Sequence, residues 1–372
     1  MSDVVKLTQE LVRIESVSRD SNREVSDKLR EVMEGVGFVV EELVYDDENG
    51  VEKVSLIGKK GEGSGGLGFF SHSDTVPGAE DEWAAFDPVV KEGKLYGRGS
   101  CDMKGPLAAT ILAAAEFEPL TLKKPVYVVV TADEENGFGG AKHVLEASQT
   151  FAEGGWPEMG VIAEPTEMKV VYAHKGGYFV RATAYGRAAH TSTDMGVSAN
   201  FLIAPFMAEM TELRQLFMRD ERFMNDEFSP PTNGFNMTVD DGNCAGNVTA
   251  VKTTCTVNFR TMPEAHIEEA LALITEKAQA YNLETEVRGY DPFYTDPAAP
   301  IIQLALQATG EKTAETVPYG TDALVFKDAL PLVMLGPGNI AQAHTVDEWI
   351  DVAQLEASVQ VYRRMIALYC AD

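Results

Sequence analysis

Hydrophobic residues recur with two different periods along the first third of the chain. Residues 4–14 and 25–36 carry apolar side chains at the three-to-four-residue spacing of an amphipathic helix. Apolar runs of strand length follow at 38–44, 53–57 and 67–71. Helices that alternate with strands in this way predict an α/β domain.

Further apolar segments extend this pattern. Residues 125–131, with the sequence PVYVVVT, are almost continuously β-branched, as expected of a strand that is buried on both faces. The Ala-rich segment 105–117 predicts a helix, 160–163 a short strand, and 354–371 a final helix. The α/β domain is therefore expected to include both ends of the chain.

The pattern changes near residue 175. Strand, helix, strand, strand, helix and strand are predicted in that order, at 177–185, 197–218, 235–239, 248–260, 264–281 and 283–287. This order predicts an α+β unit in which two helices cover one face of an antiparallel sheet. The Pro- and Asp-rich segment 291–300 is interpreted as a linker. We therefore expect one domain at 1–175 and 291–372, and an inserted domain at 176–290.

Charge and cysteine content restrict the partners and the location. The net charge is −27, with 58 acidic against 31 basic residues, which argues against binding to nucleic acid or to an anionic membrane. No signal peptide is visible, and no apolar run reaches the roughly 18 residues of a membrane span. None of the four cysteines forms a C-x-x-C pair, so a reduced, cytoplasmic protein is expected, with Cys101 as a small buried residue.

Five candidate metal ligands lie in separate short motifs. They are His72 in SHSDTVP, Asp102 in GRGSCDMKG, Glu135 in TADEENG, Glu164 in IAEPTE and His344 in QAHTVDEW. Two histidines and three carboxylates suit two divalent cations that share one bridging carboxylate. Zn²⁺ fits this set, and Co²⁺ or Mn²⁺ would accept the same ligands.

Two neighbouring acids have expected roles beside these ligands. Asp74 lies two residues after His72, so on an extended chain its carboxylate could accept the free ring N–H of that histidine. Glu134 precedes Glu135, and successive side chains point in different directions, which leaves Glu134 as a general base. Each motif alone also fits a helix cap, a structural histidine or a solvated acidic loop. Together they favour a hydrolase that activates water between two cations.

The five motifs, in this order and over essentially the whole chain, resemble those of the M20 metallopeptidases and deacylases. The resemblance implies a metallopeptidase-type α/β catalytic domain with a central twisted mixed sheet, and an inserted ferredoxin-like lid. It implies that His72 and Glu164 hold one zinc, that Glu135 and His344 hold the other, and that Asp102 bridges them. Glu134 would be the general acid and base, and the peptide bond after Asp102 would be cis.

The resemblance also assigns residues outside the metal site. His190 in GRAAHTS would stabilise the oxyanion, often in the partner subunit's site, and Asn247 and Arg260 would bind the substrate carboxylate. The loop Gly320–Thr321–Asp322 would lie near the substrate tail, where close relatives tend to carry Glu instead of Asp322. A second departure is Ser198–Ala199–Asn200, where the family usually has Asn–Ala–Ile or Asn–Ala–Leu.

The implied activity is hydrolysis of an N-acyl amino acid by a homodimer that is formed through the lid. N-acetylornithine is the expected substrate, which would place the enzyme in arginine biosynthesis. Succinyl-diaminopimelate, other acyl amino acids and dipeptides are the alternatives. A non-catalytic amino-acid-binding relative and a metal-stabilised structural protein are two further alternatives. The complete set of ligands, with Glu134 beside it, argues against both.

Overall fold

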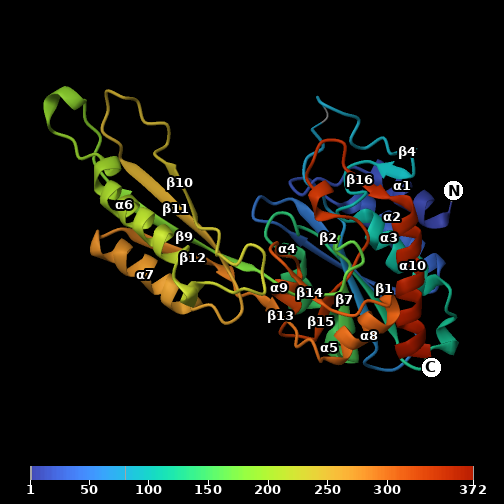
Figure 1. Ribbon diagram of the computed structural model, residues 1–372. Coiled ribbons are helices and arrows are strands. Elements are labelled where there is room, and N and C mark those ends of the chain that lie inside the picture. Colours follow the sequence, from blue (N-terminus) through green and yellow to red (C-terminus); the bar gives the residue numbers. More distant parts are fainter. Residues whose placement is uncertain (1, 80, 372) are drawn as a thin grey trace. The chain divides into compact units, whose positions relative to one another are not determined.

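The computed structural model describes residues 2–79 and 81–371, which form two compact units. The first unit comprises the chain up to Tyr172, the segment Thr295–Glu315 and the chain from Thr321. The second comprises Ala173–Tyr294 and the short segment Thr316–Gly320. Each unit has its own sheet and is described by itself (Figure 1).

The first unit is built on a mixed sheet. Its strands follow the order β1 (Val39–Asp46), β2 (Glu52–Lys60), β6 (Val126–Thr131), β3 (Leu67–His72), β7 (Met159–Ile162), β15 (Leu332–Met334), β8 (Val171–His174) and β13 (Phe293–Tyr294), with β14 (Glu315–Val317) beside β8. The end of β8, all of β13 and most of β14 lie in the chain segments assigned to the second unit. Strand β3 runs parallel to both β6 and β7, and β7 runs parallel to β15. The pairs β1–β2, β2–β6, β15–β8 and β13–β8 are antiparallel. The predicted mixed α/β sheet is therefore confirmed.

Helices cover both faces of this sheet (Figure 1). One face carries α1 (Asp3–Arg13), α2 (Arg23–Gly35), α3 (Lys104–Ala115), α8 (Pro300–Thr309) and α10 (Val352–Ile366), and the other carries α4 (Gly139–Ala147), α5 (Gln149–Gly154) and α9 (Ala323–Phe326). Every residue of β3 and β6 is buried between these layers. This is the burial that the continuous apolar run at 125–131 predicts.

A buried lysine joins the sheet to two helices. Lys60 of β2 is 2% exposed, and its ammonium donates to the main-chain oxygens of Val36 at 2.7 Å and Ala114 at 2.9 Å. These carbonyls lie at the C-terminal ends of α2 and α3, where carbonyls have no partner within the helix and a cation is favoured. Burial lowers the pKa of Lys60, and the carbonyls satisfy its donors.

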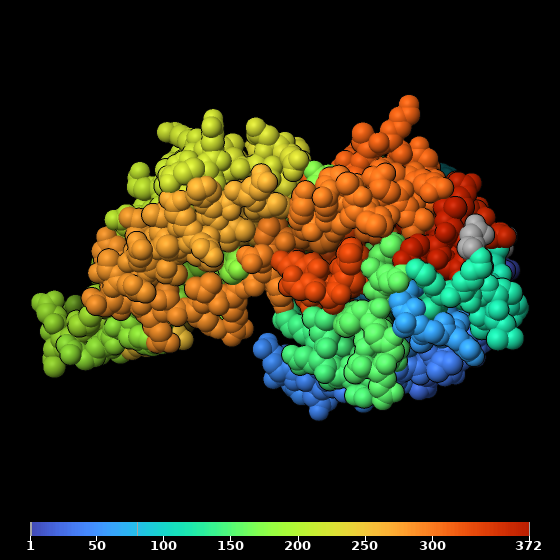
Figure 2. Space-filling view, turned by 90° about the horizontal axis from the view of Figure 1, so that it is seen from below, coloured from blue at the N-terminus to red at the C-terminus, as the bar shows by residue number. Residues whose placement is uncertain are grey.

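Smaller elements complete the first unit. A three-stranded sheet joins β4 (Val89–Lys91), β5 (Lys94–Tyr96) and β16 (Trp349–Asp351), which the hydrophobic pattern did not predict because the strands are short. Figure 2 shows the surface where segment 295–315, in orange, lies beside the red C-terminal part. Short helical turns occur at Pro119–Thr121 and Ile340–Gln342, and a π turn at Ala367–Ala371. Among the described residues, no helix is long and apolar enough to cross a membrane.

The second unit has the strand order β10 (Asn236–Asp240), β11 (Lys252–Thr261), β9 (Gly176–Tyr185) and β12 (Glu284–Tyr290), all antiparallel. Helices α6 (Ala199–Phe217) and α7 (Ile267–Ala280) pack on one face through an apolar core. Turns at Thr191–Thr193 and Glu221–Phe223 flank α6. The order β-α-β-β-α-β is that of the ferredoxin-like fold, as the sequence predicts. The expected linker 291–300 is not entirely irregular, because it contains β13 and the first residue of α8.

Candidate active site

The sheet of the first unit brings the candidate ligands to one edge. His72 ends β3, Glu134 and Glu135 follow β6, and Glu164 follows β7. These three strands are adjacent and parallel, so their carboxyl ends meet at the same edge, where ligands collect in open α/β sheets. Asp102 precedes α3 after a glycine-rich turn, and the peptide bond between Asp102 and Met103 is cis, as expected.

The two oxygens of Asp102 face different histidines. Oδ1 lies 3.1 Å from Nε2 of His72, which is also 3.7 Å from Oε1 of Glu164. Oδ2 lies 3.3 Å from Nε2 of His344, which is also 2.9 Å from Oε1 of Glu135. The five side chains therefore form two groups of three donors that share Asp102. His72, Asp102 and Glu135 also satisfy the spacing of a group that could hold a single metal ion.

The main chain fixes the ring of His72. Its Nδ1 lies 2.9 Å from the carbonyl oxygen of Asp74, so Nδ1 carries the hydrogen and the lone pair of Nε2 points at Asp102. The sequence predicts that the carboxylate of Asp74 accepts this N–H. Its Oδ1 is 3.6 Å from Nδ1, whereas the carbonyl is at hydrogen-bond distance, so the main chain of Asp74 orients the ring.

The carboxylate of Asp74 holds the acidic loop instead. Its oxygens accept the main-chain N–H of Glu134 at 3.2 Å and of Glu135 at 3.3 Å, and the hydroxyl of Ser18 donates to it at 2.6 Å. Asp133, just before, has a left-handed φ of 56°. The chain thus turns after β6, which explains how two consecutive glutamates lie at one site. A lone serine at position 18 carries no sequence signal of this role.

Burial and mutual repulsion shift the titration of the acids. Burial, followed by the nearby charge of Asp102, raises the pKa of Glu164 well above its ordinary value. Burial likewise raises the pKa of Glu134, to which Glu164 and Asp322 add and which His72 opposes. Burial would also raise the pKa of Asp102, but hydrogen bonds from His344 and His72 hold it below its usual range.

This electrostatic arrangement fits two divalent cations. In the described part of the chain, the ion pairs of Asp102, Glu135 and Glu164 come from the two histidines. Hydrogen bonds to Asp102 and Glu135 raise the pKa of His344 to about 10, so without a metal ion this imidazole is drawn into the charged form. Carboxylates and histidines that lie this close together are typical ligands of Zn²⁺ and similar ions.

The loop predicted near the substrate tail also reaches this region. Thr321 and Asp322 are buried in the first unit, whereas Gly320 closes the segment assigned to the second. Thr131, the last residue of β6, donates to Oδ2 of Asp322 at 2.5 Å, and Oδ1 has no hydrogen-bond partner among the described residues. Burial raises the pKa of Asp322 to about 7.

The predicted lid residues lie in the second unit, at two separate places. His190 and Asn247 are neighbours, because the N–H of Thr191 donates to the carbonyl of Asn247 at 3.0 Å. Arg260 lies near the far end of β11, which has 10 residues and so spans about 30 Å. All three side chains are exposed. The second unit therefore presents His190 and Asn247 at one end and Arg260 at the other.

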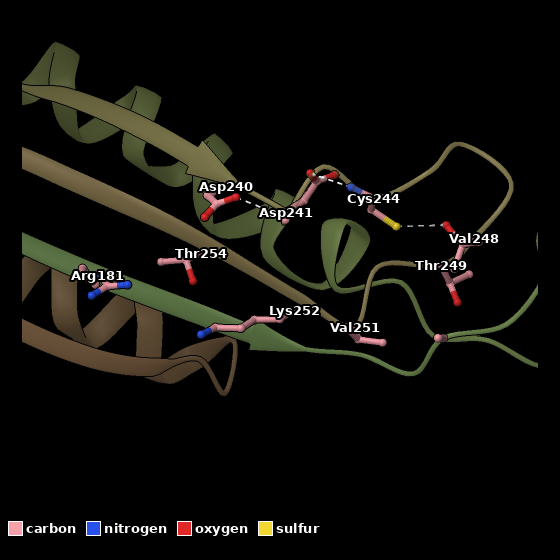
Figure 3. A pocket seen from close by; sticks show the side chains of 11 residues that line it. Arg181, Asp240, Asp241, Cys244, Val248, Thr249, Val251, Lys252 and Thr254 are labelled. Carbon is pink, nitrogen blue, oxygen red and sulfur yellow. Dashed lines mark hydrogen bonds between the residues drawn. The ribbon is translucent and has the colours of Figure 1, made fainter.

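A surface pocket of about 360 Å³ also lies on the second unit (Figure 3). Its lining includes Arg181, Lys252, Asp240 and Cys244, whose Sγ lies 3.5 Å from the carbonyl of Val248. None of the predicted site residues lines it. The clustered ligands of the first unit are the better candidate for chemistry.

The comparisons with known proteins agree with this geometry. The model of peptidase family M20/M25/M40 matches residues 68–368. The chain is 32% identical to an acetylornithine deacetylase of Myxococcus xanthus, over 97% of this chain and 96% of that protein. It is also 32% identical to an acetylornithine deacetylase of Pectobacterium atrosepticum, over 90% and 88%.

Solved structures share the fold. An M20 family metallo-carboxypeptidase from Sulfolobus solfataricus superposes with a TM-score of 0.76 at 15% identity, covering 99% of both chains. A tripeptidase from Staphylococcus aureus gives 0.73 at 21% identity, covering 98% of this chain and 97% of the other. A dinuclear metal-binding M20 peptidase from Bacillus subtilis gives 0.66 at 17% identity, covering 98% and 96%. The chain therefore belongs to peptidase family M20/M25/M40 and is a metal-dependent hydrolase.

Proposed function

We propose that this enzyme hydrolyses the amide bond of an N-acyl amino acid, with N-acetylornithine as the substrate. The observation that carries the reaction class is that Asp102 faces a histidine with each of its two oxygens, next to Glu134. The substrate rests on relatives named acetylornithine deacetylase, which match at 32% identity over nearly the whole chain. Deacetylation of this compound would serve arginine biosynthesis.

The proposed metal ligands are the five residues of the two donor groups. His72 and Glu164 would hold one cation, Glu135 and His344 the other, and Asp102 both. When bound, two divalent cations polarise a carbonyl and lower the pKa of a water molecule held between them. Zn²⁺ is proposed, and Co²⁺ or Mn²⁺ would fit the same donors.

Glu134 is the proposed general base and acid. Its main chain is held by Asp74, whereas its carboxylate makes no ion pair among the described residues. The carboxylate is thus free to take a proton from the attacking water and to return it to the leaving nitrogen. Burial, and then the charges of Glu164 and Asp322, raise the pKa of Glu134 and favour its protonated form, which supports its second task.

Residues of the second unit would bind and stabilise the substrate. Nδ1 of His190 accepts the N–H of Ser192 at 3.2 Å, so in the neutral ring Nε2 carries the hydrogen and can donate to an oxyanion. Arg260 would bind the α-carboxylate through two parallel hydrogen bonds, and Asn247 from the other chain of a dimer would assist it. Gly320, Thr321 and Asp322 would contact the substrate tail, where the unpartnered Oδ1 of Asp322 suits a cationic group.

The opposite positions of His190 and Arg260 support a homodimer. About 30 Å of strand separates them, so one lid does not present both to the same metal cluster. We propose that Arg260 serves the site of its own chain and that His190 and Asn247 serve the site of the partner. The end of the second unit that carries His190 also has exposed apolar residues, which support a subunit contact there. They are Met195, Phe201, Leu202 and Val251.

The proposed partners and location complete the assignment. The substrate is a small molecule, and a net charge of −27 disfavours nucleic acid and anionic membranes. Cys101, Cys255 and Cys370 are buried free thiols, and Cys244 is free and half-buried. Unpaired thiols are typical of reducing compartments, which supports a cytoplasmic location.

The experiment compares hydrolysis of N-acetylornithine and N-succinyl-diaminopimelate by metal-free protein that is refilled with Zn²⁺ or Co²⁺. Metal-dependent release of ornithine is expected. Glu134→Ala should lower turnover about 10²- to 10⁴-fold without changing the bound metal. Glu146→Ala is the matched control, because Glu146 is an exposed glutamate on α4 and should leave turnover unchanged.

Each outcome separates the alternatives. Activity on the succinyl compound alone would assign the enzyme to desuccinylation, and activity on neither would lead to other acyl amino acids and dipeptides. A Glu134→Ala variant with near-normal turnover would disprove the role of Glu134. Amino-acid binding without turnover of any substrate would favour the non-catalytic alternative.

A further inference from the structure

A buried acid with no assigned role contacts the main chain of the bridging residue. Glu348 follows His344 by four residues and is fully buried. Its Oε1 accepts the main-chain N–H of Cys101 at 2.9 Å and of Asp102 at 3.0 Å. One carboxylate oxygen thus connects the segment that carries His344 to the segment that carries Asp102.

The other oxygen of Glu348 forms a buried ion pair. Oε2 lies 2.6 Å from Nη1 of Arg98, which is 3% exposed. Nε of Arg98 donates to the carbonyl of Pro77 at 3.2 Å, and the guanidinium lies 5.7 Å from the ring of Trp83. Pro77 is the last residue of the SHSDTVP motif, which contains His72. The ion pair between Arg98 and Glu348 therefore connects the three chain segments that carry His72, Asp102 and His344.

The turn before Asp102 contains two glycines with positive φ. Gly97 and Gly99 have φ values of 150° and 83°, and glycine loses more conformational freedom on ordering than any other residue. The N–H of Gly97 also donates to the carbonyl of Glu348 at 2.9 Å. A buried ion pair contributes little net stability compared with apolar packing, so its placement at this turn needs another explanation.

We propose that Glu348 and Arg98 are positioning residues that hold the main chain at Asp102, so that its two oxygens face the two histidines. The inference rests on the proposed function, because it takes Asp102 as the shared metal ligand. Replacing a residue that hydrogen-bonds to a metal ligand and orients it typically lowers metal affinity by about 10- to 100-fold. The pair should therefore be required for tight binding of the cations.

The test is a Zn²⁺ competition titration against a chromophoric chelator, with metal-free protein. Glu348→Gln keeps the shape of the side chain, but its amide N–H groups oppose the guanidinium of Arg98. A loss of Zn²⁺ affinity of about 10- to 100-fold is expected, together with an altered absorption spectrum of the Co²⁺-loaded protein. Glu116→Gln is the matched control, because its ion pair with Arg363 has the same 2.6 Å length but is exposed, and its affinity should match the wild type.

A double variant separates positioning from simple stability. Arg98→Met with Glu348→Met removes both charges, so no unpaired charge remains buried. Weakened Zn²⁺ binding by the folded double variant supports positioning, and wild-type affinity overturns it. If the double variant does not fold, the folded Glu348→Gln variant is judged by the same criterion. Failure of the wild-type protein to bind two Zn²⁺ would instead disprove the proposed metal site.

Discussion

Lys53 lies 2.9 Å from Oδ1 of Asp133, the residue directly before Glu134. Lys53 is 1% exposed, and its ammonium also donates to the carbonyl of Asp20 at 2.9 Å. The hydroxyl of Tyr45 donates to Oδ2 of Asp133 at 2.9 Å. At the left-handed turn that presents the two glutamates to the site, Oδ2 of Asp133 thus accepts a hydrogen bond, whereas Oδ1 has the cation of Lys53 beside it but no hydrogen bond among the described residues.

Replacing Lys53 should destabilise the protein more than any surface lysine. Lys53→Met leaves the carboxylate of Asp133 buried without its cation, which typically costs about 3–5 kcal/mol. The melting temperature measured by circular dichroism should fall accordingly. Lys6→Met is the control, because Lys6 is exposed beside Asp3 and should change stability by less than about 0.5 kcal/mol.

A second substitution checks the cause of that loss. Asp133→Asn in the Lys53→Met background removes the unpaired charge, and asparagine tolerates the left-handed φ of 56°. Stability should then recover in part. If the double variant is as unstable as Lys53→Met, the loss arises from packing and not from the buried charge.

Metal removal should loosen the first unit. Without cations, burial and then the charges of neighbouring acids raise the pKa of Glu134 and of Glu164 at one edge of the sheet, so keeping these carboxylates charged opposes folding. Adding Zn²⁺ to metal-free protein at about 100 times its dissociation constant should stabilise it by about 2.7 kcal/mol. The thermal shift should persist in Glu134→Ala and largely disappear in Asp102→Ala. Equal shifts in both variants would contradict the assignment of Asp102.

The sequence predicts the parts of the site that follow long apolar strands. His72 ends β3 and Glu135 lies four residues after β6, and the fully buried runs of these strands identify the edge at which they end. Glu348 could not be found in this way. In the motif HTVDEW it resembles a solvated acidic residue, and only the fold shows that Arg98, 250 positions earlier in the chain, pairs with it. The strands β4, β5 and β16 lie close to these two residues in the chain. Each strand is so short that its apolar and polar positions cannot show the alternation from which a strand is predicted.

Lys175 should make the stability of the second unit depend on alkaline pH. It is 2% exposed and donates to the carbonyls of Pro230 and Thr232, both at 2.7 Å. Burial, assisted by the charge of Arg260, lowers the pKa of Lys175 to about 8, below the ordinary value of about 10.4. The unfolded chain therefore binds more protons between pH 8 and 10.4, so wild-type stability should rise with pH across that window.

The measurement compares wild type with Lys175→Met from pH 7 to 10. The difference in unfolding free energy should shift in favour of the wild type by up to about 1.4 kcal/mol per pH unit above pH 8. Below pH 8 the lysine is charged in both states, and the difference should be constant. Lys6→Met, with its exposed lysine, should run parallel to the wild type throughout. Parallel curves for Lys175→Met would show that Lys175 keeps an ordinary pKa.

The ring orientation of His190 predicts which substitutions preserve activity. Because Nδ1 accepts the N–H of Ser192, the donor to an oxyanion is Nε2. Glutamine places an N–H group near the position of Nε2, whereas the amide of asparagine reaches only that of Nδ1. His190→Asn should lower kcat by about 10²- to 10³-fold with little change in KM, and His190→Gln should lower it less. Equal losses would argue against donation from Nε2.

Mixed dimers test whose site His190 serves. If it acts in the partner's site, a dimer of one His190→Ala and one Glu134→Ala subunit holds one complete site, with Glu134 from the first and His190 from the second. Neither variant is active alone, but random mixing makes half of the dimers mixed, so about a quarter of wild-type activity should return. If His190 acts in its own chain, every site in every mixed dimer lacks one of the two groups. Subunit exchange is verified with differently tagged chains. If no activity returns, His190 acts in the site of its own chain. The distance between His190 and Arg260 would then no longer support a dimer.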